Sequence, residues 1–275
     1  MIKTNYHTHV SYCNHAEGNV FDYVKYAYEN GFIELGMSDH GPVLKEFLPE
    51  DKYFRFGCNR DMSLDTFEKY LSEIEQAKEM YKDKLKIYSA LETEYIEEQY
   101  EFYKYLRSKV DYLNLGMHYF KYNGNYYSTF GEVNYITIEG YVDVVIKALK
   151  TGLFNTLVHP DVFMFNYKSA NGIREFDDIA INASRRILEA CIENNVYVEM
   201  NANGIANSIT FGKSNIWLYP CCEFWQLAKE YKKLKIIIGA DAHKPEALNN
   251  IYVEQLCEYV KKENIQICEK MEINH

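Results

Sequence analysis

The chain has 275 residues, an apolar fraction of 47% and a net charge of −10. It contains no run of about eighteen apolar residues, so no membrane span is expected, and its acidity argues against broad binding to a nucleic-acid backbone. The start is too short and too polar for a targeting peptide, and none of the seven cysteines forms a Cys-x-x-Cys pair, so we expect a cytoplasmic protein with reduced thiols.

The first predicted strand, residues 2–9, ends in His7-Thr8-His9. Side chains on a strand alternate between its two faces, so His7 and His9 are expected to point to the same side. Two imidazoles side by side near a strand end make half of a metal site. His15 follows after a short loop and could serve a second ion.

The rest of the chain alternates between helical and extended patterns. Gly31 ends the first helix, and residues 119–127, rich in tyrosine around Asn123-Gly124, are predicted to form a loop. The predicted helices are 20–30, 64–81, 97–108, 138–150, 178–194, 222–231 and 246–261, and the strands between them are 33–37, 85–91, 112–115, 156–158, 196–200 and 235–238.

About seven βα units follow from this alternation. Parallel neighbouring strands need a crossover connection, so the pattern predicts parallel strands with helices outside. No glycine-rich dinucleotide turn is present, which favours a closed barrel over a doubly wound sheet. Barrels of this kind reach the length of the chain as single units, so we expect one domain over residues 1–275.

Seven of the eight histidines lie at or just after predicted strand ends, and three carboxylates share these positions. In parallel α/β barrels the carboxyl ends of the strands form the active-site face. One such histidine alone is more commonly a hydrogen-bonded core residue, but seven at successive strand ends favour metal binding. The ten residues are His7, His9, His15, His40, His118, His159, His243, Asp39, Glu92 and Asp241.

The order and spacing of these segments resemble the motifs of the PHP (polymerase and histidinol phosphatase) family. The resemblance runs from residue 7 to residue 243 and implies an α/β fold, a distorted (β/α)7 barrel of the PHP type, with three metal ions. Within the family, the chain is most similar to histidinol-phosphate phosphatases. The stretches that carry this closer resemblance are 9–15, Leu91–Ile96, Val198–Asn201, Tyr219-Pro220 and Asp241–Glu246.

The resemblance also implies a distribution of metal ligands. His7, His9, Glu92 and Asp241 would hold one ion, and Glu92 would bridge to a second ion completed by His118 and His159. The third ion would be held by His15, His40 and His243. Mixed imidazole and carboxylate ligands suit Zn, Mn or Fe better than Ca or Mg.

The implied activity is hydrolysis of a phosphate monoester. Three divalent ions among two carboxylates give a local charge of roughly +4, which attracts a phosphate dianion despite the acidity of the whole chain. Metal-activated hydroxide would attack phosphorus in line. The expected reaction converts L-histidinol phosphate to L-histidinol and phosphate in histidine biosynthesis, with Asp39, Glu92, Asp241 and His243 as catalytic residues. The acid for the leaving group stays open between Asp39 and a water.

The substrate contacts are predicted less directly. Arg55, Lys213 and Lys244 lie in predicted loops and are candidates to bind the phosphate. Histidinol phosphatases often have a basic residue soon after an Asn-x-x-Gly segment, whereas here Asn203-Gly204 is followed by Ile205-Ala206. Because histidinol is cationic, an acidic or aromatic contact would suit it, and the candidates are Glu94, Tyr95 and Phe163.

Two alternatives remain beside the histidinol phosphatase. One is a phosphoesterase of the same family that acts on a sugar phosphate, a nucleotide or phosphotyrosine. The other is a non-enzymatic PHP module like those attached to DNA polymerases, which is disfavoured because the ligand set is intact and the chain carries no polymerase domain. The expected partner is a small-molecule phosphate ester, and the oligomeric state stays open.

Overall fold

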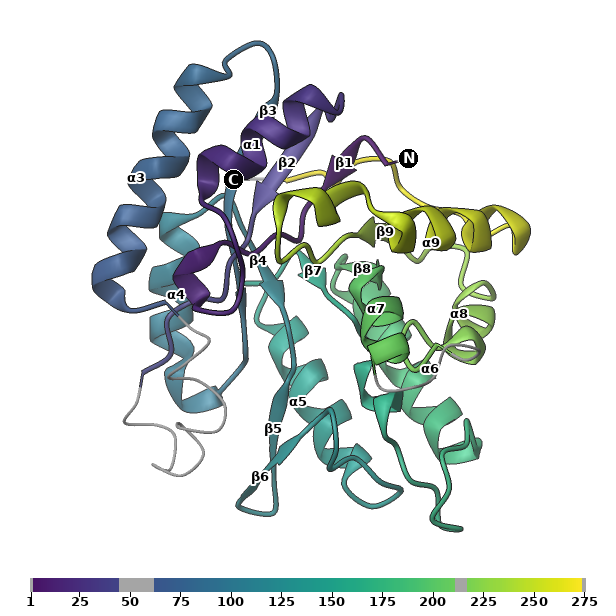
Figure 1. Ribbon diagram of the computed structural model, residues 1–275. Helices are drawn as coiled ribbons and strands as arrows, with labels where there is room; N and C mark the ends of the chain where they lie inside the picture. Colours follow the sequence, from purple (N-terminus) through teal and green to yellow (C-terminus); the bar gives the residue numbers. More distant parts are fainter. Residues whose placement is uncertain (1, 45–61, 211–216, 274–275) are drawn as a thin grey trace.

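A computed structural model describes residues 2–44, 62–210 and 217–273. The core is a sheet of seven parallel strands that curls into a nearly closed barrel (Figure 1). Along the sheet the strands are β1 (Thr4–Asn5), β2 (Glu34–Met37), β3 (Lys86–Thr93), β4 (Tyr112–Leu115), β7 (Thr156–Leu157), β8 (Tyr197–Asn201) and β9 (Ile236–Gly239). The predicted (β/α)7 barrel is confirmed.

The seam between β1 and β9 makes the barrel irregular. The strand predicted over residues 2–9 is only two residues long, because the side-chain amide of Asn5 bonds to the carbonyl of His7 and the hydroxyl of Thr8 and turns the chain out of the ladder. Beyond this turn a single bridge joins Thr8 to Ala242. The same Asn5 accepts a hydrogen bond of 2.8 Å from the backbone N–H of Ala240, which closes the seam.

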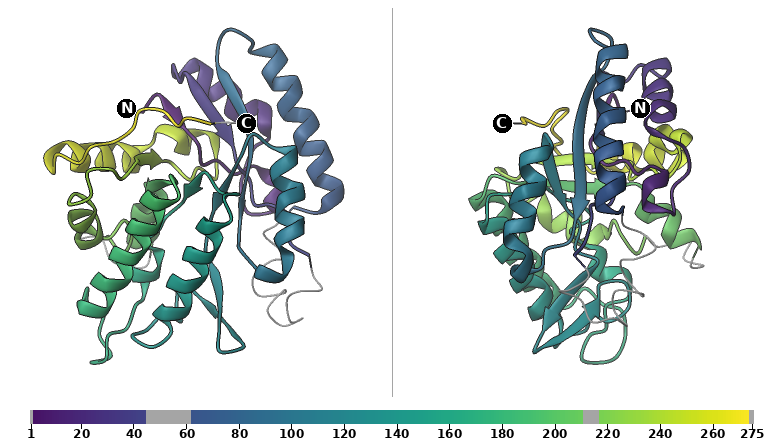
Figure 2. Two further views of the ribbon diagram at one scale, coloured as in Figure 1. Left: turned by 180° about the vertical axis from the view of Figure 1, so that it is seen from behind. Right: turned by 90° about the vertical axis from the view of Figure 1, so that its left-hand side faces the viewer.

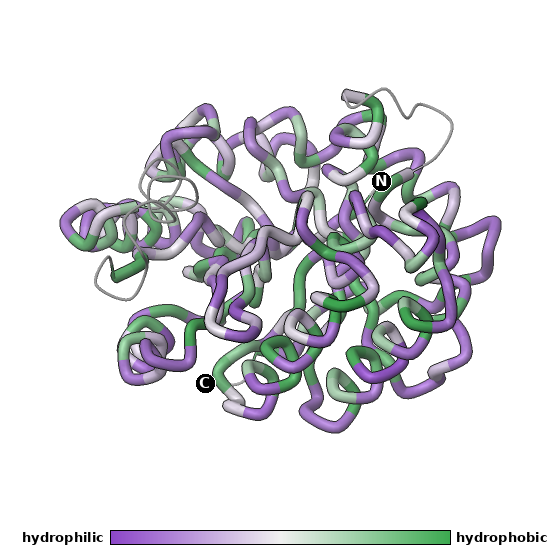
Figure 3. The backbone as a smooth tube through the Cα atoms, turned by 90° about the horizontal axis from the view of Figure 1, so that it is seen from below, coloured by the Kyte–Doolittle hydropathy of each residue, from purple (hydrophilic) through white to green (hydrophobic). Residues whose placement is uncertain are grey.

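The helices surround the barrel, with α3 to α6 following one another along the outside (Figure 2). Polar and apolar residues alternate along the outer helices when the molecule is seen from below (Figure 3), as expected for helices with one buried face. No helix in the described ranges is long and apolar enough to cross a membrane. The helices are α1 (Val20–Glu29), α3 (Leu64–Met80), α4 (Tyr100–Lys109), α5 (Ile138–Lys150), α6 (Asp178–Glu193), α7 (Asn203–Thr210), α8 (Cys222–Ala228) and α9 (Ile251–Lys262).

The segment predicted as a loop after β4 is instead a hairpin of two antiparallel strands, β5 (Tyr119–Tyr122) and β6 (Asn125–Ser128). Asn123 and Gly124 form its turn with φ of 48° and 81°. Positive φ at both central positions is what a two-residue hairpin turn requires, and Asn-Gly is the pair that adopts it most readily. The hairpin extends beyond the carboxyl ends of the strands (Figure 1).

The closing helix was predicted to begin too early, and one short helix was missed. The closing helix, predicted from residue 246, begins at Ile251, because Pro245–Asn249 forms a separate 3-10 turn and the side chain of Asn250 caps α9. The short helix α7 was not predicted. Its sequence, Asn203 to Thr210, is rich in small and polar residues and gives little helical signal.

The amino end of the barrel is closed by aromatic rings. Tyr6, Tyr88 and Tyr112 form a triangle with ring centroids 6.2 to 6.3 Å apart. The segment after α9 runs beneath them, where Met271 is 4% exposed and its N–H donates to the hydroxyl of Tyr6. This end is therefore filled, and the polar side chains gather at the carboxyl end.

Candidate metal centre

The carboxyl end of the barrel holds a pocket of about 380 Å³ whose walls are mainly imidazoles and carboxylates. The structure places all seven predicted histidines here, and His7 lies beneath the others, 1% exposed. The side chains that line the pocket are His9, His15, His40, Glu92, Glu94, His118, Tyr119, Phe130, His159, Asn203, Asn207, Tyr219, Asp241 and His243.

The carboxylate of Glu92 lies at the centre, near the end of β3. Its Oε1 is 2.8 Å from Nε2 of His159 and 3.6 Å from Nε2 of His118. Its Oε2 is 3.4 Å from Nε2 of His7 and 3.1 Å from Nδ1 of His40. The two oxygens thus face two different groups of imidazoles, the arrangement that a carboxylate bridging two ions needs.

A glycine makes room for this carboxylate. A Cβ on Gly116, on the neighbouring strand's exit, would collide with the carboxyl group of Glu92. Any larger residue there would displace the central carboxylate from between its imidazoles.

The carboxylate of Asp241, just after β9, faces a second group. Its Oδ1 lies 3.0 Å from Nε2 of His9 and 3.6 Å from Nε2 of His7, and it accepts no hydrogen bond within the described structure. Its Oδ2 accepts bonds of 3.2 Å from the amides of Asn201 and Asn203. One oxygen is therefore fixed by the protein and the other is available to a ligand.

His15, His40 and His243 meet at the outer edge of the pocket. Nε2 of His15 lies 3.0 Å from Nε2 of His243, and the ring of His15 stacks on that of His40 with centroids 5.0 Å apart. His9 also comes close, because its donor atom lies within 4.8 Å of those of His40 and His243. The three predicted groups of ligands therefore form one continuous cluster.

A second layer of carboxylates holds several rings in place. Glu199 Oε1 lies 2.8 Å from Nδ1 of His7, and Glu94 Oε1 lies 2.7 Å from Nδ1 of His118. Such contacts keep the proton on Nδ1 and direct Nε2 into the pocket. Asp39 is fully buried 3.4 Å from Nδ1 of His9, and it accepts the N–H of His40, so it lies behind the pocket wall.

The charges of the cluster are strongly coupled. Burial by itself would lower the pKa of His7, but Glu199, Asp241 and Glu92 outweigh it and raise that pKa to about 10. Burial would raise the pKa of Glu92 and of Asp241, yet the surrounding imidazoles hold both well below their usual range. The cluster therefore favours bound positive charge, which protons or metal ions can supply.

The donor set fits metal ions. Nε2 of His7 and Nε2 of His9 are only 3.0 Å apart, and the free Oδ1 of Asp241 lies beside them. Ligand atoms of a tetrahedral zinc ion, with bonds of about 2.0 Å, are separated by about 3.3 Å. The spacing of these buried atoms is thus close to that of ligands around a shared ion.

Of the residues predicted to contact the substrate, only some line the pocket. Arg55 and Lys213 lie outside the described residues. Lys244 has its side chain 57% exposed, with Nζ 3.7 Å from Glu17, and does not line the pocket. Phe163 is buried in the core and is not part of the pocket wall, whereas Glu94 is.

The wall also contains residues that were not predicted as contacts, among them Phe130, Asn207 and Tyr219. The ring of Phe130 stacks on that of His118 with centroids 5.8 Å apart. Asn207 donates a 2.6 Å hydrogen bond to the hydroxyl of Tyr219, whose ring packs near His159. Asn207 lies on the unpredicted helix α7, so the sequence pattern gave no reason to place it here.

Comparison with known proteins identifies the class of this chain. The family model described as PHP domain matches residues 5–203. The chain therefore belongs to the PHP domain family.

Three similar proteins are described as histidinol phosphatases. A protein of Schizosaccharomyces pombe named "Probable histidinol-phosphatase" is 31% identical over 107 residues, and the match spans 38% of this chain and only 34% of that protein. The crystal structure of HisK from Listeria monocytogenes has a TM-score of 0.72 at 18% identity and covers 92% of this chain and 99% of its own. Histidinol phosphate phosphatase from Lactococcus lactis, in complex with zinc, L-histidinol and phosphate, has a TM-score of 0.70 at 16% identity, covering 98% of both chains. At these identities the two structures establish the shared fold.

Proposed function

We propose that this protein is a metal-dependent phosphomonoesterase that hydrolyses L-histidinol phosphate to L-histidinol and phosphate. The observation that carries the proposal is the carboxylate of Glu92, whose two oxygens face separate groups of imidazoles at the bottom of an open pocket. The descriptions of the relatives from S. pombe and L. lactis support the choice of substrate.

In this proposal three divalent ions, of Zn, Mn or Fe, share nine side chains. His7, His9, Glu92 and Asp241 would hold the first, Glu92 with His118 and His159 the second, and His15, His40 and His243 the third. Such ions would supply positive charge for the phosphoryl oxygens and a lower pKa for an attacking water.

The protein's own groups orient the site and the substrate. Glu199 and Glu94 hold the Nδ1 protons of His7 and His118. The hydroxyl of Tyr219 accepts a hydrogen bond from Asn207 and keeps its own proton to donate to a substrate oxygen. Asp39 keeps His9 and the backbone of His40 in position behind the wall, and Asp241 and His243 face the substrate.

A second candidate is hydrolysis of a different phosphate ester at the same centre. One observation favours it: Lys244 and Phe163, which were predicted to contact histidinol phosphate, do not line the metal pocket. The predicted contacts that would distinguish histidinol phosphate from other esters are therefore only partly present there.

The experiment is steady-state turnover of L-histidinol phosphate beside a sugar phosphate, a nucleoside monophosphate and phosphotyrosine, with protein of measured metal content. The proposal expects kcat/KM to be highest for L-histidinol phosphate. A clear preference for another ester would select the second candidate, and no turnover of any ester by the metal-loaded protein would reject both.

A further inference from the structure

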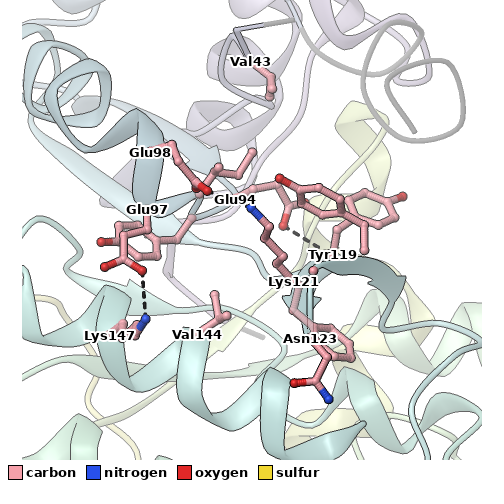
Figure 4. A pocket seen from close by; sticks show the side chains of 14 residues that line it. Val43, Glu94, Glu97, Glu98, Tyr119, Lys121, Asn123, Val144 and Lys147 are labelled. Carbon is pink, nitrogen blue, oxygen red and sulfur yellow. Dashed lines mark hydrogen bonds and ion pairs between the residues drawn. The ribbon is translucent and has the colours of Figure 1, made fainter. Parts of the chain in front are cut away.

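A second cavity of about 330 Å³ adjoins the metal pocket, and we call it the side pocket. It lies between the segment after β3, the hairpin β5–β6 and helix α5 (Figure 4). Glu94 and Tyr119 line both cavities. The two cavities therefore adjoin at these two side chains, and a ligand that occupies both would pass beside them.

The walls of the side pocket are largely aromatic and aliphatic. Tyr95, Tyr119 and Tyr126 line it together with Val144 of α5, and Tyr119 and Val144 are labelled in Figure 4. Aromatic faces of this kind accept flat rings and attract organic cations.

The side pocket contains one carboxylate more than its lysines neutralise. Lys147 lies 2.8 Å from Glu97, and Lys121 lies 2.8 Å from Glu98, so two pairs neutralise each other at the rim. Glu94 is paired with no lysine or arginine in the described structure, and its contacts are the ring and backbone N–H of His118 and the N–H of Tyr119. With His118 neutral, as a metal ligand is, the side pocket carries roughly one negative charge.

We propose that the side pocket binds the alcohol part of the phosphate ester, and that it selects a ring bearing a protonated amine. The inference rests on the proposed function, because it assumes that the phosphoryl group sits at the ions. The amine would lie against Glu94, where burial strengthens charge attraction, and the ring would lie among the tyrosines. An uncharged or anionic alcohol cannot make the ion pair with Glu94.

Filling the side pocket tests this directly. Val144 and Ile146 are both half-buried on α5, but only Val144 lines the side pocket. Val144→Trp should therefore block it, and Ile146→Trp is the matched control for a bulky substitution on the same helix. Thermal unfolding of both variants establishes that they are folded.

Four esters separate the contributions of the ring and of the amine. L-histidinol phosphate and O-phosphotyramine carry both, 4-ethylphenyl phosphate lacks the amine, and ethyl phosphate lacks both the ring and the amine. In Val144→Trp we expect KM for the two ring amines to rise roughly tenfold or more, with kcat/KM for ethyl phosphate within twofold of wild type. The wild-type preference for O-phosphotyramine over 4-ethylphenyl phosphate should fall in this variant. Ile146→Trp should behave as wild type. Unchanged KM values in Val144→Trp, or an equal loss for ethyl phosphate, would overturn the inference.

Calorimetry with free tyramine keeps this inference separate from the proposed function. If no ester is hydrolysed, the proposed function fails, yet tyramine binding that is present in wild type and lost in Val144→Trp still supports the side pocket. Absence of tyramine binding to the wild-type, metal-loaded protein would overturn it.

Discussion

The carboxylate of Glu92 is the residue on which the candidate centre depends most. Five imidazoles, those of His7, His9, His40, His118 and His159, lie within 3.6 Å of its two oxygens. If it bridges two ions, Glu92→Ala should lose more than one equivalent of metal and lower kcat by roughly 10³-fold. Elemental analysis and turnover measure the two effects. His275→Ala, at a histidine outside the described residues, is the control and should change neither, and full metal occupancy in Glu92→Ala would rule out the bridge.

His15 tests the third ion. It lies in the loop after β1, yet its Nε2 is 3.0 Å from that of His243. Three neutral imidazoles leave the charge of an ion uncompensated, so this ion should bind the substrate phosphate strongly. His15→Ala should therefore weaken the third site by roughly tenfold and raise KM or lower kcat, while the ion of His7 and Asp241 remains. A variant crystal with three ions and wild-type turnover would contradict this role.

At the residue scale, the sequence predicted the cluster because its members follow successive strands at fixed positions. The supporting side chains were harder to predict. Glu199 lies inside a strand, where a carboxylate can equally pair with any buried base, and only the fold shows that its partner is His7. Asn207 depends on a helix that local propensity does not reveal. Phe130 reaches His118 only because the hairpin returns the chain to the pocket.

At the element scale, Asp111 joins three elements. Asp111 directly precedes β4. Its Oδ2 accepts hydrogen bonds from the backbone N–H and the hydroxyl of Ser89 on β3 and from the ammonium group of Lys78 on α3. Burial alone would raise the pKa of Asp111, but these bonds lower it below its usual value. The stabilisation is therefore present above the unfolded pKa and is lost as the pH falls through the lower, folded pKa.

Asp111→Asn should reduce the free energy of unfolding by about 1–2 kcal/mol at pH 7. The difference from wild type should shrink as the pH falls below the ordinary carboxyl value of 3.8. Urea denaturation at several pH values measures it. Glu75, which also contacts Lys78 but is 66% exposed, gives the control: Glu75→Gln should cost less than about 0.5 kcal/mol. A difference for Asp111→Asn that is constant with pH would contradict the assignment.

Element boundaries were predicted well where the hydrophobic period is long and poorly where side chains redirect the backbone. Helix α5 was predicted at its observed bounds, because its apolar residues repeat regularly over 138–150. The strand at residues 2–9 was predicted too long. The alternation that predicts a strand does not reveal that the side chain of Asn5 donates hydrogen bonds to His7 and Thr8, which end the strand. The hairpin could have been predicted from Asn123-Gly124 between tyrosine-rich segments.

At the scale of the whole molecule, the amino end of the barrel is a packed core and the carboxyl end holds the candidate metal centre. The segment after α9 closes the amino end, so Met271→Ala should lower stability by about 2–3 kcal/mol without changing turnover at the opposite end. Denaturation midpoints and kcat/KM measure the two. Glu269→Ala, an exposed position in the same segment, should leave both unchanged. Loss of turnover in Met271→Ala at temperatures where the variant is folded would show that the ends are coupled.

The number of strands, their parallel order and the end of the barrel that holds the centre could all be predicted from the sequence, because βα alternation and the placement of histidines constrain them together. The extent of the single domain over residues 1–275 and the cytoplasmic location stay predictions. The side pocket could not be predicted, since Glu94, Tyr126 and Val144 come from separate elements whose packing only the structure shows.

The most direct test of the central proposal is a metal titration of the chelated protein, followed by hydrolysis of L-histidinol phosphate. Protein stripped of metal should be inactive, and activity should rise with added Zn or Mn and level off near three equivalents, because the nine side chains form one cluster around Glu92. Full activity of the stripped protein, or no activity at any metal content, would contradict a metal-dependent phosphomonoesterase.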